Sequence, residues 1–164
     1  MQYPITQIMR TISKRTQYGL KAMLALASRY GEGPVLIATL SKQETIPIKF
    51  LELILLDLKG GGLLVSKKGP RGGYQLSRPP STITLGGLIR MMEGPLAPLP
   101  CASETAYRPC DECADIESCG TRIIMRQVRD ATANVLDGTT LADLIRQVGA
   151  ARKNIPQEPL MYYI

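Results

Sequence analysis

Apolar residues recur at helical spacing in three stretches of the N-terminal part of the chain. The spacing predicts a helix from Ile12 to Tyr30, a short helix over residues 36–43, and a third helix that begins at Pro47 and ends at the glycines 60–62. Pro47 suits the first helical position, where its missing N–H costs nothing. The residues expected to face inward from this third helix are Phe50, Leu51, Ile54, Leu55 and Leu58.

Two short alternating runs follow, over residues 63–68 and 74–77, on either side of a Gly/Pro turn. This pattern predicts a β-hairpin. A hairpin directly after a helix, short helix, turn and helix has the layout of a winged helix-turn-helix. Lys67, Lys68 and Arg71 crowd its tip, where tandem glycines let the backbone approach a phosphate or a groove without Cβ clashes. The alternative is that the hairpin is only a tight connection.

The C-terminal half is predicted to hold three more helices. The first is capped by residues 81–84 and runs to Glu93, and three prolines between residues 94 and 100 then break regular structure. A longer helix spans residues 120–136, and a short one spans residues 140–148. The long helix has a continuous apolar stripe, which indicates packing against the rest of the chain or a second copy. The stripe consists of Ile124, Val128, Ala131 and Val135.

These elements predict a mainly α fold with a small β-hairpin, built as a winged helix-turn-helix head and a long dimerisation helix. We expect a DNA-binding domain over residues 10–80. A linker helix, a cysteine loop and the dimerisation helix follow over residues 81–148, and a flexible tail over residues 149–164. The composition agrees with a helical core, since the chain has one Phe and no Trp, so that aliphatic side chains must fill it.

Charge is distributed unevenly. Residues 1–100 hold 13 Lys and Arg against 5 Asp and Glu, whereas residues 101–119 carry a net charge of −4. A basic N-terminal module favours a polyanion such as DNA, and the alternative is a generic basic surface. No apolar stretch is long enough to cross a membrane, and the first ten residues lack the layout of a secretory signal. We therefore expect a cytoplasmic protein without a membrane partner.

All four cysteines, Cys101, Cys110, Cys113 and Cys119, lie in one 19-residue stretch, and the chain has no histidine. Cytosolic thiols are kept reduced, so such a cluster indicates metal binding or redox chemistry. The missing histidine excludes His-based acid–base catalysis and the common His/Cys zinc sites. An iron–sulfur cluster, a zinc site and a thiol–disulfide switch remain open, although only Cys110 and Cys113 have the spacing of a zinc knuckle.

Several short motifs resemble the IscR, NsrR and CymR family of bacterial winged-helix regulators, the Rrf-two family, over about residues 10–148. The resemblance implies a homodimer that binds double-stranded operator DNA and is not an enzyme. For members with the cysteine loop it implies an iron–sulfur cluster whose state controls DNA binding, and we expect the [2Fe–2S] type. The motifs are Ser13-Lys14, residues 18–20, residues 50–52, residues 69–74, residues 93–96 and residues 140–144.

The resemblance also assigns roles within the cysteine loop. Cys101, Cys113 and Cys119 match the three cysteine ligands that family members typically use. The fourth, non-cysteine ligand would correspond to Arg122 or Gln17, and neither side chain is a good ligand. Cys110 is the additional thiol that could complete the set.

On the DNA side, Lys49 and Glu52 lie in the first turns of the expected recognition helix, where side chains reach base edges. A glutamate there can accept a hydrogen bond from cytosine N4, and the resemblance implies that Glu52 selects sequence. The alternative is that Glu52 only pairs with a nearby lysine. We expect Lys14, Lys67, Lys68 and Arg71 to complete the DNA-binding surface. Lys68 stands where the family places a minor-groove arginine.

Two other classes of function stay open from the residues alone. The first is a cluster carrier or dithiol oxidoreductase, against which the complete winged helix argues because neither task needs one. The second is a regulator that senses through a protein partner, with the cysteines secondary. In the favoured interpretation, the cysteine loop lies between the DNA reader of one subunit and the dimerisation helix.

Overall fold

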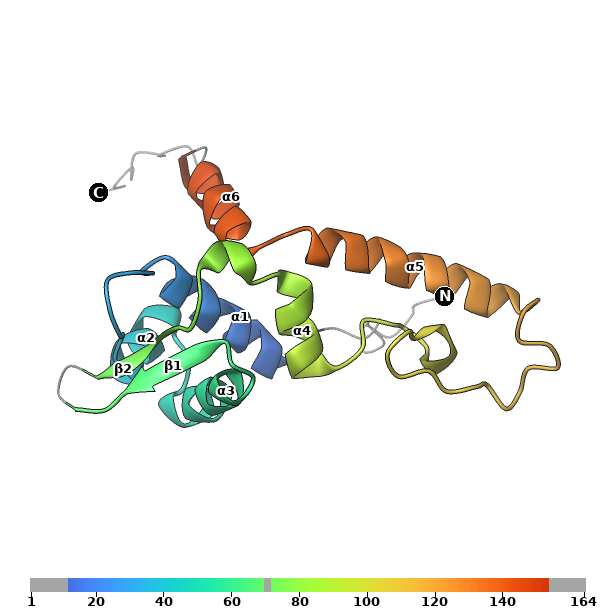
Figure 1. The fold of residues 1–164 in the computed structure, drawn as a ribbon, viewed down its shortest axis with the longest axis horizontal. Helices are drawn as coiled ribbons and strands as arrows, with labels where there is room; N and C mark the ends of the chain where they lie inside the picture. Colours follow the sequence, from blue (N-terminus) through green and yellow to red (C-terminus); the bar gives the residue numbers. More distant parts are fainter. Residues whose placement is uncertain (1–11, 70–71, 154–164) are drawn as a thin grey trace, which may run out of the picture.

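The computed structural model describes residues 12–69 and 72–153. In this part of the chain, six α-helices and one two-stranded antiparallel sheet form a head from which a long helix extends (Figure 1). This is the mainly α winged helix-turn-helix fold predicted from the sequence. The elements are α1 (Lys14–Ala27), α2 (Ile37–Glu44), α3 (Ile48–Gly60), β1 (Leu64–Lys67), β2 (Gly73–Leu76), α4 (Leu85–Glu93), α5 (Gly120–Asp137) and α6 (Leu141–Lys153), with short 3-10 turns at Pro80–Thr82 and Pro100–Ala102.

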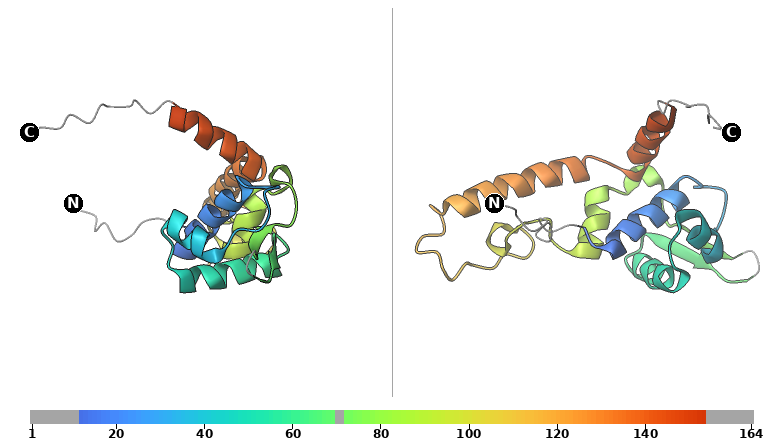
Figure 2. Two further views of the ribbon diagram at one scale, coloured as in Figure 1. Left: turned by 90° about the vertical axis from the view of Figure 1, so that its left-hand side faces the viewer. Right: turned by 180° about the vertical axis from the view of Figure 1, so that it is seen from behind.

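We call residues 12–93 together with α6 the head, the described residues 94–119 the cysteine loop, and the cysteine loop with α5 the arm. Views from the front and from behind place the cysteine loop at the end of the molecule opposite the hairpin (Figures 1 and 2). Among the described residues, no helix has both the length and the apolar character needed to cross a membrane.

The core of the head forms where α1, α2 and α3 pack together. Leu51, Ile54, Leu55 and Leu58 of α3 are fully buried, as their spacing predicts. The prediction that Phe50 also faces inward is wrong, because its side chain is 37% exposed. Successive helical residues differ by about 100° in direction, so the residue before Leu51 lies at the edge of the buried stripe. There the ring of Phe50 packs edge-to-face on Tyr18.

The helix ends differ from the predicted ones by a few residues. Ser13 caps α1 by accepting a hydrogen bond from the Thr16 N–H, so this helix begins at Lys14, and it ends at Ala27. Pro47 is the N-cap of α3 rather than its first helical residue. The turn before it contains Thr45 in the left-handed conformation, with φ of 55°. A side-chain cap or a turn of this kind moves a helix end without changing the apolar pattern.

The hairpin is anchored to the rest of the head by an additional backbone bridge. β1 pairs with β2 in the register Leu64↔Leu76 to Lys67↔Gly73, and Val35 exchanges backbone hydrogen bonds with Tyr74. Gly73, with φ of 140°, is required here, because a Cβ at this position would lie 2.2 Å from the Val35 carbonyl oxygen. The tip residues Pro70 and Arg71 lie outside the described residues, and so does the predicted DNA contact of Arg71.

Helices α4 and α6 close the head around the root of α5. Thr84 caps α4, and backbone hydrogen bonds from Leu85 to Thr139 and from Leu141 to Ile83 join the two chain segments. Helix α6 packs on α1 and runs to Lys153, past the predicted end at Val148. Residues 149–153, which were predicted to begin the tail, are therefore helical, and the rest of that tail lies outside the described residues.

Candidate functional site: an exposed helix face and a cysteine loop

The outward face of α3 presents the two residues singled out for base contacts. Lys49 and Glu52 are exposed on this helix, which packs its other faces on α1, α2 and β1. Within the described residues, neither side chain makes a hydrogen bond or an ion pair, so the alternative that Glu52 pairs with a nearby lysine is not what the structure contains. Both side chains are available to a ligand.

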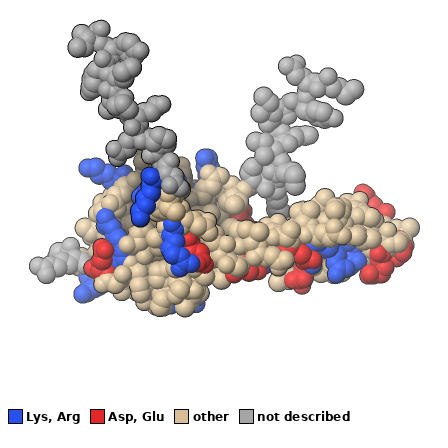
Figure 3. Space-filling view, turned by 90° about the horizontal axis from the view of Figure 1, so that it is seen from above, with Lys and Arg blue, Asp and Glu red and all other residues tan. Residues whose placement is uncertain are grey.

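The predicted lysines of the hairpin and of α1 lie on neighbouring elements. Lys67 ends β1 and Lys68 follows it, and both are exposed. Lys59 of α3 donates from Nζ to the Ser66 hydroxyl at 2.8 Å, which ties the helix to the hairpin. Lys14 starts α1 and donates to Gln17 at 3.3 Å. In Figure 3, Lys and Arg gather on the head, whereas Asp and Glu are prominent on the arm.

Three of the four cysteines meet in the cysteine loop. The Cys113 and Cys119 sulfur atoms are 3.6 Å apart, and the Cys110 thiol is close enough to contribute to the raised pKa of Cys113. A disulfide would bring two sulfurs to about 2.05 Å. Two thiolates bound to one tetrahedral metal through bonds of about 2.3 Å lie roughly 3.8 Å apart. The observed separation therefore suits two ligands of one metal and also a pair of reduced thiols.

Hydrogen bonds shift the pKa values of two of these thiols in opposite directions. Hydrogen bonds with Cys110 and then with Cys119 raise the pKa of Cys113 to about 12. The backbone N–H of Arg122, followed by the Cys113 thiol, lowers the pKa of Cys119. Because a thiolate is the form that binds metal or attacks a disulfide, Cys119 is more readily activated than Cys113.

Cys101 is held apart from the other thiols. Its carbonyl oxygen accepts a hydrogen bond from Arg122 Nε at 3.1 Å, and no interaction among the described residues joins its thiol to Cys110, Cys113 or Cys119. Accordingly, the described residues contain no group of three or more Cys, Asp or Glu side chains arranged to hold a metal ion. The donor chemistry fits an iron–sulfur cluster and one ligand pair has the required spacing, but a complete ligand set needs the loop to close.

Two arginines on one face of α5 hold the cysteine loop. Arg122 also reaches the Ile116 carbonyl and the Glu117 carboxylate, both at 3.4 Å. Arg129 is 8% exposed and donates from Nη1 to the Ala102 carbonyl at 2.6 Å, while Nη2 lies 3.1 Å from Glu104. The sequence prediction missed this role of Arg129. Its signal was the seven-residue spacing from Arg122, which puts both side chains on one helix face.

The opposite face of α5 carries the predicted apolar stripe, and this stripe is uncovered. Ile124, Val128 and Val135 are all exposed, Val135 at 67%. The helix thus presents one face to the cysteine loop and the other to solvent in the single chain. A second copy or another partner is the natural way to cover such a stripe.

Arg15 connects the end of α4, directly before the cysteine loop, to α3. Arg15 of α1 donates from Nη1 to the Met92 carbonyl at 3.2 Å, at the end of α4, and its Nη2 forms an ion pair with Asp57 of α3. Gly19 lets α4 come this close to α1, since a Cβ there would lie 2.5 Å from the Met92 sulfur. The sequence held no signal for this junction, because its members are far apart in the chain.

A second ion pair joins α4 to the C-terminal end of α5, where that helix meets the head. Arg90 donates from both terminal nitrogens to the two carboxylate oxygens of Asp137, at 2.6 and 2.8 Å. This bidentate contact lowers the pKa of Asp137 and raises that of Arg90. The orientation of α5 relative to the head is therefore set at its root by a directional contact.

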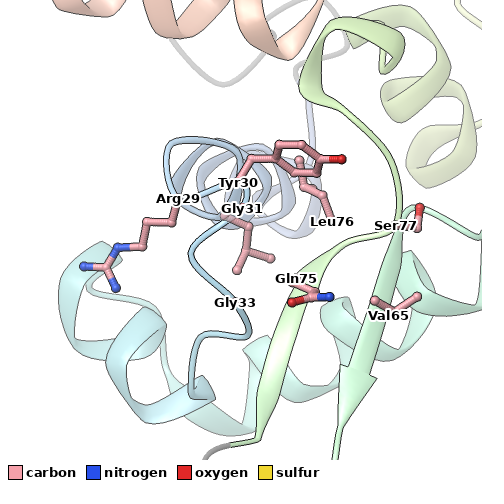
Figure 4. Close-up of a pocket in the computed structure, with 9 residues that line it drawn as sticks. Arg29, Tyr30, Gly31, Gly33, Val65, Gln75, Leu76 and Ser77 are labelled. Atoms are coloured by element: carbon pink, nitrogen blue, oxygen red, sulfur yellow. The ribbon is translucent and has the colours of Figure 1, made fainter.

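The head also has a shallow pocket of about 380 Å³ between the end of α1 and the hairpin (Figure 4). Arg29 and Tyr30 extend to opposite sides of it, and Gln75 and Ser77 line the hairpin side. None of the four cysteines and none of the predicted DNA-contacting residues lines this pocket, so it is separate from both sites described above.

Comparisons with known proteins agree with this architecture. The Rrf2 family, described as an iron-dependent transcriptional regulator, matches residues 12–147. The chain is 35% identical to the HTH-type transcriptional regulator CymR of Bacillus subtilis, over 93% of this chain and 99% of CymR. It is 31% identical to the HTH-type transcriptional regulator IscR of Erwinia tasmaniensis, over 82% of this chain and 78% of IscR.

Solved structures give the same result. CymR, the global cysteine regulator of B. subtilis, superposes with a TM-score of 0.72 at 33% identity, covering 85% of this chain and 98% of CymR. IscR of T. potens gives 0.69 at 29% identity, covering 94% and 97%. An oxidized form of Staphylococcus aureus CymR gives 0.65 at 30% identity, covering 83% and 96%. With its winged helix-turn-helix head and this similarity along nearly its whole length, the chain belongs to the Rrf2 family of DNA-binding transcriptional regulators, which are not enzymes.

Proposed function

We propose that this regulator is a homodimer whose affinity for operator DNA responds to an iron–sulfur cluster held by the cysteine loop. The observation that carries the proposal is the 3.6 Å separation of the Cys113 and Cys119 sulfurs, beside Cys110, in a loop bonded to α5. Cys110, Cys113 and Cys119 would hold the cluster, with Cys101 as the fourth ligand. When bound, the cluster supplies thiolate–iron bonds that oxidants, nitric oxide or iron shortage can break.

The DNA-binding surface in this proposal consists of α3 and the hairpin. Lys49 and Glu52 reach base edges in the major groove, while Lys14, Lys67, Lys68 and Arg71 contact phosphates or the minor groove. The exposed, unpaired state of Lys49 and Glu52 supports this assignment. The second reader comes from the other subunit, which packs its α5 stripe against Val128 and its neighbours.

A change in the cysteine loop has a short route to α3. The loop begins directly after Met92 and Glu93, and Glu93 accepts a hydrogen bond from the Ser13 N–H at 2.7 Å. Arg15 then links the Met92 carbonyl to Asp57 on α3. A displacement of the loop root would shift α1 and α3 together. A coupling free energy of about 1.4 kcal/mol, which changes operator affinity tenfold, lies within the usual range for allostery.

A second candidate is a thiol–disulfide switch between Cys113 and Cys119. The 3.6 Å separation of the two sulfurs and the lowered pKa of Cys119 both favour it. A peroxide would accept the two electrons and two protons released as the sulfur–sulfur bond forms. The two sulfurs need to approach from 3.6 Å to about 2.05 Å, a small movement for a surface loop.

Anaerobic purification from iron-replete cells separates the two candidates. For the cluster, we expect bound iron and sulfide with visible absorption, both lost in Cys113→Ser, and at least a tenfold difference in operator affinity between the loaded and emptied protein. Protein without iron and sulfide whose operator affinity responds to peroxide, but not in Cys113→Ser, would support the disulfide switch instead. Equal operator affinity in all states would exclude both kinds of sensor.

The route from the cysteine loop through Arg15 to α3 can be tested separately with a substitution of Arg15. Arg15→Met removes both the bond to Met92 and the ion pair with Asp57, so we expect the cysteine loop to load normally while operator affinity no longer depends on its state. Arg29→Met is the control for removal of an arginine, since Arg29 lies in the turn that follows α1 and makes no ion pair with the described residues. A full response to loading in Arg15→Met would contradict this route and leave the cluster proposal intact.

A further inference from the structure

The outward face of α3 is unusually apolar for a helix that reads DNA. Leu53 and Leu56 are 60% and 55% exposed, although the four inward residues of the same helix are fully buried. They follow Lys49 at i+4 and i+7, so the three side chains lie in one stripe opposite the core. Glu52 borders this stripe. The two leucines therefore occupy the centre of the face that would enter the major groove.

Leucine at this place restricts which bases can lie opposite. It offers no hydrogen bond, so seating it against the donors and acceptors of a guanine, adenine or cytosine edge leaves those groups without partners. The one apolar group exposed in the major groove is the C5-methyl of thymine. An apolar stripe on a recognition helix thus favours thymine by contact and disfavours the other bases by lost hydrogen bonds.

The charges around the stripe favour DNA over a protein as the partner that binds this face of α3. Lys49 lies within it, and Lys59, Lys67 and Lys68 lie on α3 and the adjoining hairpin. Residues 1–100 hold 13 Lys and Arg against 5 Asp and Glu, which gives the head a strong attraction for a polyanion. A basic border around two exposed leucines matches a groove with phosphates at its rims and methyl groups on its floor.

We propose that Leu53 and Leu56 are specificity-determining residues that read thymine methyl groups in the operator, next to the cytosine that faces Glu52. Glu52 and Leu56 are one turn apart, which is about 6 Å along the helix. A base step is about 3.4 Å, so the contacted thymines lie within about two base pairs of that cytosine. This inference rests on the proposed function only in that α3 reads the operator, and it does not depend on the cysteine loop.

Replacing thymine by deoxyuridine tests the inference, because it removes only the methyl group. The probe is the duplex that the full-length protein selects from a randomised pool, with each thymine of a half-site replaced in turn. We expect about a fourfold loss of affinity for each contacted methyl, and none for thymines in the flanks. In Leu53→Ala and in Leu56→Ala, replacing the thymine that the removed leucine contacts should no longer lower the affinity.

Leu36→Ala is the matched control, an exposed leucine at the start of α2, the helix that crosses the phosphate backbone. It should keep the full deoxyuridine sensitivity of the unchanged protein. The inference is overturned if no thymine of the selected duplex responds, or if both α3 variants stay as sensitive as the control. It is also overturned if these variants alter only the oligomeric state. Failure to select any duplex would instead reject operator reading by this chain altogether.

Discussion

The head and the arm differ in where their apolar side chains lie. In the head, α1, α3 and α4 bury theirs against one another, and large side chains such as Met23, Leu55 and Leu88 are nearly or fully inaccessible. In α5 of the arm, Arg129 is the single buried residue, and the apolar stripe is exposed. The head therefore buries its apolar side chains within one chain, whereas the apolar stripe of the arm is left exposed in it.

The kind of contact differs as well. Helix packing fixes the head, and it needs no particular chemistry beyond shape and apolar area. The arm is positioned by directional polar contacts, namely Arg122 and Arg129 on loop carbonyls and Arg90 on Asp137. Arg90 and Asp137 are both partly exposed, and polar contacts of this kind have low net stability and can be exchanged, which is the property that a switching element needs.

The largest expected effect comes from truncating the core of the head. Leu55→Ala leaves a cavity in a fully buried site and should lower the free energy of unfolding by about 2–5 kcal/mol. Val135→Ala, on the exposed stripe of α5, should change it by less than about 0.5 kcal/mol in the monomer. Urea denaturation at low protein concentration measures both. Equal losses in the two variants would mean that burial within the chain stabilises the arm as much as it stabilises the head.

An intermediate effect, on self-association, is expected when a charged residue is introduced into the apolar stripe of α5. Val128→Asp would bury a carboxylate in the proposed dimer contact and should weaken self-association roughly 30-fold, with little change in monomer stability. Analytical ultracentrifugation gives the dissociation constant. Arg126→Asp places the same charge on an exposed face of α5 away from the stripe and should leave the dimer intact. A dimer that tolerates Val128→Asp would place the contact elsewhere.

The smallest effect concerns the ion pair at the root of the arm. The folded-state pKa of Asp137 is lowered by Arg90, so its stabilisation is present above the ordinary value of 3.8 and is lost as the pH falls through the folded value. Because both side chains are partly exposed, Asp137→Asn should cost only about 0.5–1 kcal/mol at neutral pH. Thermal unfolding at several pH values should show this difference vanishing in acid. The control is Glu32→Gln, an exposed change at a residue without an ion pair among the described residues, which should leave the unfolding temperature at neutral pH unchanged.

Most of the head could be predicted because its signals are local. The stripe of Leu51, Ile54, Leu55 and Leu58 marks α3, and glycines and prolines mark its neighbours. Phe50 shows the limit of such reasoning, since apolar character alone does not tell whether a residue at the edge of a stripe is covered. Tertiary packing against Tyr18 decided that.

The contacts within the candidate site could not be predicted from the sequence, for a different reason. Arg15 and Asp57 are 42 positions apart, and Arg129 and Ala102 are 27 apart. A charged residue on a helix surface has many partners available to it, and only the docked arrangement of helices selects one. The same holds for the cysteines, because spacing along the chain did not distinguish Cys101 from the three thiols that meet.

The sequence by itself determined the helical periodicities, the basic head with its acidic loop, and a ligand set made of thiols without histidine. These are properties of neighbouring residues or of composition, and they survive any arrangement of the elements. The tertiary structure alone decided that Cys113 and Cys119 meet beside Cys110, and that Arg15 links the end of α4 to α3. Such contacts arise only when helix packing and loop closure bring distant parts of the chain together.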